Sequence, residues 1–358
     1  MNKASYKILK ENNKGINNLA YAKKLSWKYL GNIFLFLFCI AATLSLGACA
    51  GQNSGKKESQ GSISSSQSGE NAQLPGMAEN KPIKILFVGD MMFDRYIREA
   101  VEKRGGDYNY VFSEIRDFLA GYDLVVGNLE GPITDKKSVS AGTRMDDKKN
   151  FLFTFDPAVA KALAENNIKL VGLGNNHSLN QDADGLEQTK KYLAAAGVSF
   201  FGDTGGEEKR YLIKEINGRR FGFANYNYTA ENGLARALDD IENIGKNSDV
   251  VIAYPHWGME YKTGDPGQSI RDLGHKFVDA GADLVVGTHP HVIQASEVYK
   301  DKKIYYSLGN FVFDQYFQKE TMEGLGIEVT IGPDLTLEYN EVKFVMNKKG
   351  QTAMNKEQ

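Results

Sequence analysis

The sequence has little cysteine, histidine or proline and almost no net charge. Its 358 residues include two cysteines, five histidines and eight prolines, and the formal charge is −2. We expect no nucleic-acid partner, because that function requires a strongly basic surface. Both cysteines, Cys39 and Cys49, lie in or beside an N-terminal apolar segment. The rest of the chain can therefore hold neither a disulfide nor a cysteine-ligated zinc ion, which is compatible with an exported protein.

Residues 1–49 have the organisation of a secretory signal. Scattered lysines precede an apolar run at residues 33–46, which is shorter than the roughly 20 residues of a membrane-spanning helix. The run ends in Leu46-Gly47-Ala48-Cys49, which resembles the lipobox of bacterial lipoproteins, where Cys49 would be acylated and become the mature N-terminus. An uncleaved anchor helix is the alternative. Either one predicts a chain tethered at the extracytoplasmic face of the bacterial cell membrane.

Two further segments are expected to lie outside the folded body. Residues 50–80 are rich in Gly, Ser, Gln, Asn and Lys and have few large apolar side chains, which predicts a flexible tether. Residues 347–358 form a polar tail. Between these segments, residues 81–346 are predicted to form one domain.

The order of apolar runs predicts an α/β fold. Strands are expected at 83–88, 123–126, 151–155, 168–173, 198–201, 211–216, 219–225, 249–254 and 283–286, and helices at 95–103, 112–120, from 157, 184–195, 234–244 and 270–280. Later strands, at 292–299, 303–308, 311–313, 326–331 and 336–345, follow one another without helices, which suggests antiparallel pairing. Alternating βα units followed by hairpins favour two sheets packed face to face with helices outside, an αββα sandwich.

The most informative stretch is Gly287-Thr288-His289-Pro290-His291, which follows the apolar run 283–286. Two imidazoles at the C-terminal end of a buried strand can face one point, and ligands of open α/β sheets usually bind at that end. Polar side chains also end or follow other predicted strands: Asp90, Asn128, Glu130, Asn176, His177 and His256. One such residue alone is more often a structural histidine or a helix cap. The repeated placement predicts that they converge on one metal site.

Carboxylate, amide oxygen and imidazole together suit Mn, Fe, Zn or Mg. The donors exceed what one tetrahedral ion needs, so we expect two divalent ions. Such a pair, about 4 Å apart, would polarise a phosphoryl oxygen and generate a bound hydroxide for in-line attack.

Three more polar residues lie outside this set. Arg95 follows Asp90 closely and could clamp a carboxylate or phosphate, although a solvated helix arginine is an equal alternative. Asn310, in Ser307-Leu308-Gly309-Asn310-Phe311, is predicted to approach a ligand, as is Asn128, with a β-bulge as the competing explanation for Gly309-Asn310. His275 lies in a helical pattern and is expected to be structural.

Taken in order, these motifs resemble one known family. They are Gly89-Asp90-Met91-Met92 with Arg95, Gly127-Asn128-Leu129-Glu130, Gly174-Asn175-Asn176-His177, His256-Trp257-Gly258, Gly287-Thr288-His289-Pro290-His291 and Ser307-Leu308-Gly309-Asn310-Phe311. Together they look like the capsule-synthesis protein family CapA, also called PgsA, over about residues 83–315. The resemblance implies a role in making or exporting poly-γ-glutamate at the bacterial cell surface. It further implies similarity to the calcineurin-like metallophosphoesterases, with a two-sheet αββα sandwich and a dinuclear metal centre.

The resemblance also implies roles for individual residues. Asp90 would take the place of the first-motif aspartate, and His256, His289 and His291 would be histidine ligands. Asn176 would contribute an amide ligand, and His177 would stabilise the leaving group or phosphate. Two positions depart from the superfamily pattern: Met92 stands where a histidine ligand is usual, and the bridging aspartate is absent, with Glu130 the nearest candidate.

Three functions remain open at this point. The first is a surface-anchored component of capsule synthesis or export, acting on a polyanionic or phosphorylated substrate, with a membrane polymer-synthesis complex as partner. The second is a free-standing metal-dependent hydrolase of phosphate esters or amides. The third is a non-catalytic scaffold, which the strand-end histidines argue against. No lysine or arginine cluster that would bind a long polyanion stands out in residues 81–346.

Overall fold

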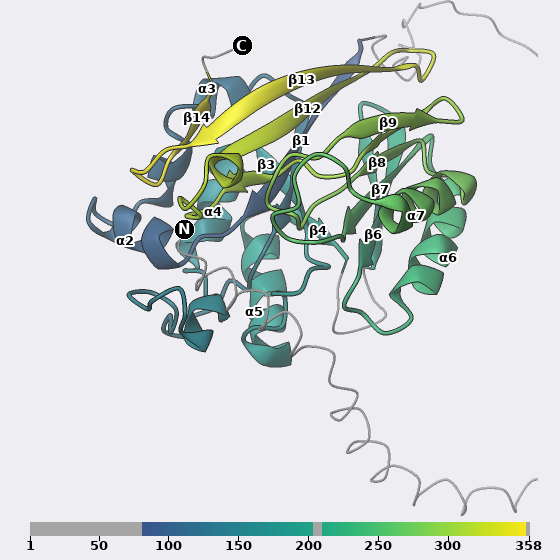
Figure 1. Cartoon of the computed structure of the whole chain (residues 1–358). Coiled ribbons are helices and arrows are strands. Elements are labelled where there is room, and N and C mark those ends of the chain that lie inside the picture. Colours follow the sequence, from purple (N-terminus) through teal and green to yellow (C-terminus); the bar gives the residue numbers. More distant parts are fainter. Residues whose placement is uncertain (1–80, 203–209, 356–358) are drawn as a thin grey trace, which may run out of the picture. The chain divides into compact units, whose positions relative to one another are not determined.

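Two β-sheets lie between two groups of helices in the computed structural model, which describes residues 81–202 and 210–355 (Figure 1). This arrangement confirms the expected αββα sandwich. The predicted signal segment, its Cys49 and the tether at 50–80 lie outside the described residues.

The first sheet has eight strands in the order β14-β13-β12-β1-β2-β3-β4, with β11 beside β1. Strands β1 to β4 are parallel, as the βα alternation predicts, whereas β12, β13 and β14 add to the other edge of β1 as antiparallel strands. Its strands are β1 (Ile83–Met91), β2 (Leu124–Leu129), β3 (Ile168–Gly172), β4 (Ser199–Phe201), β11 (Asn310–Val312), β12 (Glu323–Ile331), β13 (Leu337–Met346) and β14 (Thr352–Met354).

The second sheet has six strands in the order β5-β6-β7-β8-β10-β9. Strands β6, β7, β8 and β10 are parallel, and β5 and β9 pair antiparallel at the two edges. Asn217 and Gly218 join β5 to β6 with φ angles of 49° and 77°, the geometry of the tight turn that this dipeptide favours. Its strands are β5 (Tyr211–Ile216), β6 (Arg219–Asn227), β7 (Val250–His256), β8 (Leu284–Val286), β9 (Ser296–Tyr299) and β10 (Lys302–Tyr305).

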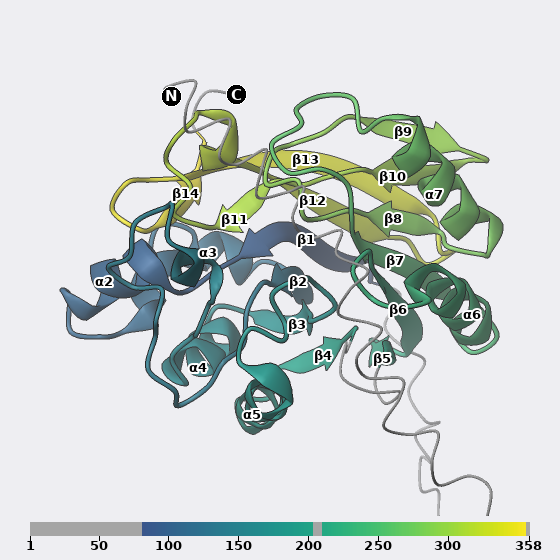
Figure 2. The same cartoon turned by 60° about the horizontal axis from the view of Figure 1, so that its bottom comes forward.

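Helices cover the outer face of each sheet (Figure 2). The first sheet carries α2 (Arg95–Glu102), α3 (Arg116–Leu119), α4 (Ala158–Glu165) and α5 (Asp182–Ala195), and the second carries α6 (Gly233–Gly245) and α7 (Gln268–Asp279). Short 3₁₀ helices lie at Tyr108–Phe112, Lys148–Phe151 and Glu320–Met322. No helix in the described part of the chain has the length and apolarity needed to cross a membrane.

Strand β1 shows why its sequence is apolar on both faces. Ile83, Ile85 and Phe87 point into the core between the two sheets, while Leu86 and Val88 point into the core beneath the helices. A strand buried on both faces needs a continuous apolar run rather than an alternating one. After Lys84, which is exposed at the start of the strand, the next polar side chain of β1 is Asp90, and it lies where the strand reaches the site.

Several boundaries differ from the sequence prediction. No strand forms at 151–155, where only Phe155 makes a bridge, to Ile133. The helix expected at 112–120 is limited to α3, which follows a 3₁₀ helix. The late strands do not form one antiparallel sheet, because β9 and β10 join the second sheet and the others join the first. Residues after 346 are not all tail, since β14 pairs with β13.

Candidate metal centre

Strand register brings the predicted residues to one place. Asp90 at the end of β1 is paired with Asn128 of β2 on one side and Asn310 of β11 on the other. In the second sheet, His256 at the end of β7 is bridged to Thr288, the residue before His289. Because the parallel strands of both sheets end here, the polar residues that follow them face a common centre.

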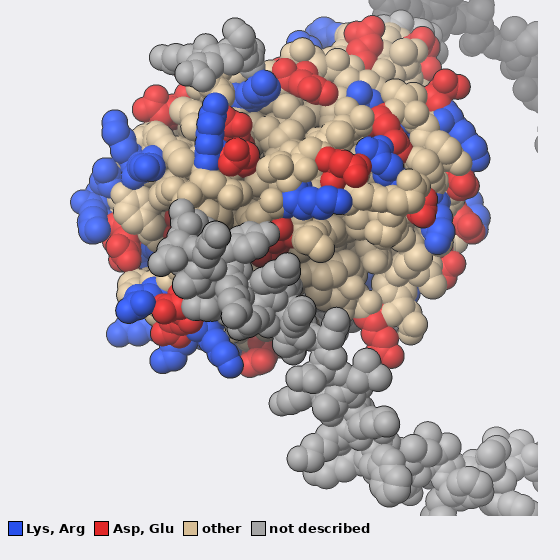
Figure 3. All heavy atoms as spheres, in the orientation of Figure 1, with Lys and Arg blue, Asp and Glu red and all other residues tan. Residues whose placement is uncertain are grey.

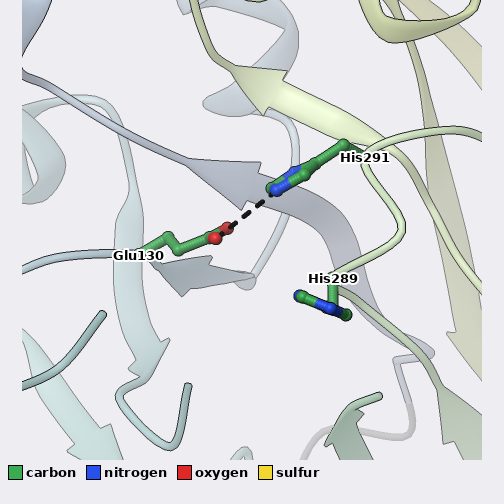
Figure 4. A group of neighbouring side chains, drawn as sticks. All are labelled: Glu130, His289 and His291. Carbon is green, nitrogen blue, oxygen red and sulfur yellow. Dashed lines mark ion pairs between the residues drawn. The ribbon is translucent and has the colours of Figure 1, made fainter. Parts of the chain in front are cut away.

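Glu130, His289 and His291 form the group best suited to hold an ion. One potential ligand atom from each lies within 4.8 Å of the others, and all three side chains are buried. Figure 4 shows Glu130 approaching from the first sheet and both histidines from the loop after β8. These three residues can hold a metal ion, and the two sheets share its ligands.

The backbone of the histidine loop is strained. His289 and His291 have φ angles of 99° and 58°, in the left-handed region that side chains rarely adopt. Such residues cost roughly 1–3 kcal/mol each and concentrate at functional sites. Both strained residues belong to the group formed with Glu130.

His291 is held from both ring nitrogens. Its Nδ1 lies 3.2 Å from Asp90 Oδ2 and 3.0 Å from Asn310 Oδ1, and its Nε2 lies 3.6 Å from Glu130 Oε1. Burial disfavours its charged form, but the carboxylates of Glu130 and Asp90 outweigh burial and raise the pKa of His291 to about 10. The pocket thus favours positive charge at this point.

The second group of ligand atoms surrounds His256. Its Nε2 lies 2.8 Å from Asn176 Oδ1, and its ring lies 4.6 Å from the ring of His289 between centroids. Burial, with the neighbouring imidazoles, lowers the pKa of both His256 and His289, so both imidazoles are neutral at pH 7. Asn176 Oδ1 and the rings of His256 and His289 therefore form a second group of potential ligand atoms.

Asn128 links the two groups. Its Nδ2 donates to Asp90 Oδ1 at 2.8 Å and lies 3.3 Å from His256 Nδ1, and its Oδ1 accepts from Asn175 Nδ2 at 3.0 Å. It is 1% exposed, and protein groups engage both ends of its amide. A contact between Asn128 and a substrate stays a prediction.

His177 has a defined proton position. Asn180 Oδ1 accepts from the backbone N–H of Phe153 at 2.8 Å, so the atom that faces His177 Nδ1 at 2.9 Å is an oxygen. His177 Nδ1 therefore carries the hydrogen, and Nε2, 3.8 Å from Glu130 Oε1, can accept a proton. Burial lowers the pKa of His177 to about 4, and its ring stacks on Phe153 at 4.3 Å.

Arg95 lies at the edge of the same site rather than in solvent. Its guanidinium donates to Asn150 Oδ1 at 3.0 Å and pairs with Asp314, and it lies over the rings of Phe153 and Phe313 at 5.1 and 5.5 Å. Its buried Nε has no hydrogen-bond partner. That N–H is a donor available to an anionic group near Glu130.

The irregular loop of residues 131–150 is anchored by a buried carboxylate. Asp94 accepts hydrogen bonds from the hydroxyls of Ser138 and Ser140, both at 2.7 Å. Asn150 at the end of this loop is the residue that orients Arg95. The loop is thereby fixed beside the site.

The departure at Met92 has a structural counterpart. Its side chain is fully buried, and its sulfur accepts a hydrogen bond from the backbone N–H of Asp94 at 3.0 Å. A thioether is a poor ligand for hard ions, and here it supports the turn into α2 instead.

Three residues of the candidate metal centre were not predicted from the sequence. Asn175 orients Asn128, and Tyr228 lies with its ring 4.7 Å from that of His289. Glu260 adds negative charge near Glu130 and His291. Asn175 belongs to the motif Gly174-Asn175-Asn176-His177, and Glu260 lies two residues after the motif His256-Trp257-Gly258, so the sequence placed both near the predicted site.

The site passes a chemical test for a bound cation. Both carboxylate oxygens of Glu130 and Nδ1 of His289 are buried without a hydrogen-bond partner. A buried carboxylate whose oxygens accept no hydrogen bond is costly, and a divalent cation beside it offsets that cost. Oxygen and imidazole donors of this kind fit Mn, Fe, Zn or Mg.

Two solved structures are distantly similar to the chain. A phosphatase structure from Mycoplasma pneumoniae is 12% identical, with a TM-score of 0.43 over 74% of this chain and 94% of that chain. The GAP50 structure from Plasmodium is 13% identical, with a TM-score of 0.36 over 76% and 88%. At such scores neither structure bears on the chemistry of the site.

Curated relatives are more similar in sequence. The PGA biosynthesis protein CapA of Bacillus subtilis (strain 168) is 31% identical over 64% of this chain and 63% of its own length. The capsule biosynthesis protein CapA of Bacillus anthracis is 32% identical over 66% and 61%. A probable polyglutamine synthesis accessory protein of Mycobacterium tuberculosis (strain CDC 1551 / Oshkosh) is 26% identical over 61% and 60%. The aligned part of this chain thus spans about three fifths of each of these relatives.

The family match covers the whole candidate site. The sequence model of the bacterial capsule synthesis protein family PGA_cap matches residues 84–315, which include Asp90 at one end and Asn310 at the other. The resemblance predicted from the motifs is confirmed, and the chain belongs to the PGA_cap family of bacterial capsule synthesis proteins.

Proposed function

We propose that this protein is a surface-anchored component of poly-γ-glutamate capsule synthesis or export, and that its strand-end site is a metal-dependent hydrolase-type centre. Membership of the capsule synthesis family and the names of its relatives support the first part. The unpartnered buried atoms of Glu130 and His289 support the second, and this observation carries it.

Five residues would bind the metal ions. Glu130, His289 and His291 would hold one ion, with Asn176 and His256 placed for a second. A bound divalent ion polarises a substrate oxygen and lowers the pKa of a coordinated water.

Two side chains would act on the substrate directly. His177 would accept a proton at Nε2 beside Glu130, since its Nδ1 already carries one. Arg95 would bind a carboxylate or phosphate oxygen through its unpartnered Nε–H. A γ-glutamyl amide and a phosphate ester each offer such an oxygen next to the bond to be broken.

The charge on the surface favours local recognition. On the described part of the face shown in Figure 3, Lys and Arg are interspersed with Asp and Glu and do not form one basic field. On this face a long polyanion would therefore be bound by local contacts and not by wide electrostatic attraction.

Metal analysis tests the centre. We would measure Mn, Fe, Zn and Mg in the full chain, in a His289→Ala/His291→Ala variant and in His275→Ala, whose histidine pairs with Glu297 outside the site. We expect stoichiometric metal in the wild type and in His275→Ala, and none in the double variant. Absence of metal from the wild type after incubation with excess ions would overturn the centre and leave a scaffold role.

Substrate screening then separates the two enzymatic functions. The metal-loaded chain would be assayed on γ-glutamyl amides and on phosphate esters, with the double variant as the blank. Cleavage of γ-glutamyl bonds supports a role on the capsule polymer. Activity confined to simple phosphate esters would favour a free-standing phosphoesterase.

The anchor is tested separately. We propose that Cys49 is acylated and holds the chain at the extracytoplasmic face, beside a membrane polymer-synthesis complex. Wild-type chain should carry labelled fatty acid and sediment with membranes, and Cys49→Ala should lose the label. A Cys49→Ala chain that keeps the label would contradict the assignment.

A further inference from the structure

Asn310 lies beside His291, but its side chain is fully buried. We propose that Asn310 is a positioning residue and not the substrate ligand predicted from its motif. Its amide oxygen accepts the Nδ1–H of His291, so that the Nε2 lone pair of this imidazole faces the ion beside Glu130. The inference rests on the proposed metal centre and assigns one of its supporting residues.

The orientation of the Asn310 amide is determined by its other neighbours. Its Nδ2 donates to the backbone carbonyl of Thr321 at 2.9 Å and to Gln315 Oε1 at 3.1 Å. A backbone carbonyl can only accept, so the nitrogen of the amide must face it. The oxygen is left to face His291 Nδ1 at 3.0 Å.

This orientation selects the protonation of the imidazole. Asn310 Oδ1 and Asp90 Oδ2 are both acceptors at His291 Nδ1, at 3.0 and 3.2 Å. A neutral His291 therefore keeps its hydrogen on Nδ1. Its unprotonated Nε2 is the atom 3.6 Å from Glu130 Oε1, where a shared ion would lie. A ligand histidine whose other nitrogen donates to an oxygen has a fixed tautomer and ring orientation.

Because of the same contacts, the side chain of Asn310 is not available to bind a substrate. Both ends of its amide are engaged, and the residue is 0% exposed. Gln315, which accepts from Asn310, in turn donates to Tyr261 Oη at 3.1 Å. The supporting network therefore extends from His291 through Asn310 to the loop after β7.

Zinc binding tests the inference in the full chain. We would titrate Zn²⁺ into wild type, Asn310→Leu and Val312→Ala, the last being a residue of the same strand that is buried in the apolar core beneath the helices. Asn310→Leu should weaken Zn²⁺ binding about 10- to 100-fold, the usual effect of losing such a partner. Val312→Ala should bind as wild type does.

Nitrogen NMR of the zinc-loaded wild type gives a readout that needs no variant to fold. Long-range ¹H–¹⁵N spectra of ¹⁵N-histidine chain, with the His291 signal assigned by its loss in His291→Ala, should show a hydrogen on Nδ1 and zinc on Nε2. Zinc on Nδ1 would overturn the inference, as would wild-type affinity in Asn310→Leu. No zinc binding by the wild type would instead overturn the metal centre itself.

Discussion

The carboxylate of Glu130 has neither exposed surface nor a hydrogen-bond partner. Burial raises the pKa of Glu130; His291 opposes the shift, and Asp90 adds to it. In the metal-free chain the burial of this charge is therefore unfavourable, although His291 offsets part of the cost, and a bound divalent cation would balance it. Function and stability place opposite demands on this residue.

Glu130→Gln should weaken metal binding without lowering the stability of the metal-free chain. We expect the amide to weaken divalent-metal binding at least about tenfold, because it removes the charge that balances the ion. The metal-free variant should be equal to or about 1 kcal/mol more stable than metal-free wild type, since an amide is buried at lower cost. Metal titration and thermal unfolding in chelator measure both effects, with the exposed Glu187→Gln as control. A metal-free Glu130→Gln chain that melts well below wild type would contradict this account.

His177 should make the metal-free chain sensitive to acid. Burial lowers the pKa of its imidazole to about 4, below the 6.5 of an unfolded histidine. Between these pH values the unfolded chain binds a proton that the folded chain does not, so this contribution to stability is present above pH 6.5 and is lost as the pH falls toward 4.

Replacing His177 by Gln removes this titration. From pH 6.5 to 4.5, wild type should lose about 2 kcal/mol more than His177→Gln, as estimated from the size of the pKa shift. Urea unfolding in chelator at the two pH values measures the difference. His256 and His289, whose pKa values are also lowered, keep part of the slope in the variant. Equal losses in both chains would show that His177 titrates normally.

At the scale of the elements, β1 and the segment before β11 approach so closely that only glycine fits. A Cβ on Gly89 would lie 1.9 Å from the carbonyl oxygen of Gly309, which accepts the backbone N–H of Asp90. This contact places Asp90 and Asn310 side by side, where both face Nδ1 of His291. Gly89 is thus required in its motif because its backbone contacts that of Gly309, which lies in a distant segment of the chain.

Gly89→Ala should force these segments apart. We expect a loss of about 1–3 kcal/mol in the free energy of unfolding, as for other overpacked sites, together with weaker metal binding because Asp90 and Asn310 shift. Gly245→Ala at the end of α6 is the matched control, since its Cβ would meet nothing closer than 3.9 Å. That substitution should be neutral or stabilise by up to about 1 kcal/mol. Denaturant unfolding of both chains tests the difference, and an unaltered Gly89→Ala midpoint would be inconsistent with the contact.

At the scale of the whole molecule, the site joins the two sheets. Glu130 follows β2 of the first sheet, whereas His289 and His291 follow β8 of the second. An ion held by all three would connect the sheets at one edge of the core between them. Metal binding and the stability of the sandwich should therefore be coupled.

Thermal unfolding should reveal this coupling. Metal at a free concentration 100-fold above its Kd should add about 2.7 kcal/mol to stability, equivalent to a rise of roughly 5–10 °C in Tm. The His289→Ala/His291→Ala chain should show no such rise over the same concentrations. An equal rise in both chains would mean that the ion binds elsewhere.

The order of elements was largely predictable from the sequence because it depends on local patterns. Apolar runs such as 83–88 need both faces buried, and Asn217-Gly218 favours one turn type, so the alternation of strands and helices follows from residues close together in the chain. The same locality explains why the polar residues after these strands could be assigned to one site: parallel strands end at a common edge.

Only the tertiary structure determined which strands pair and which side chains form hydrogen bonds. The strands after residue 292 look alike in sequence, yet β9 and β10 join one sheet and β11 to β14 the other, because pairing depends on which distant edge is free. For the same reason the motif of Asn310 could not reveal its role. Its neighbours, Thr321 and His291, are set by β11 lying against β1, and a side chain's hydrogen-bond partners are determined only when separate segments meet.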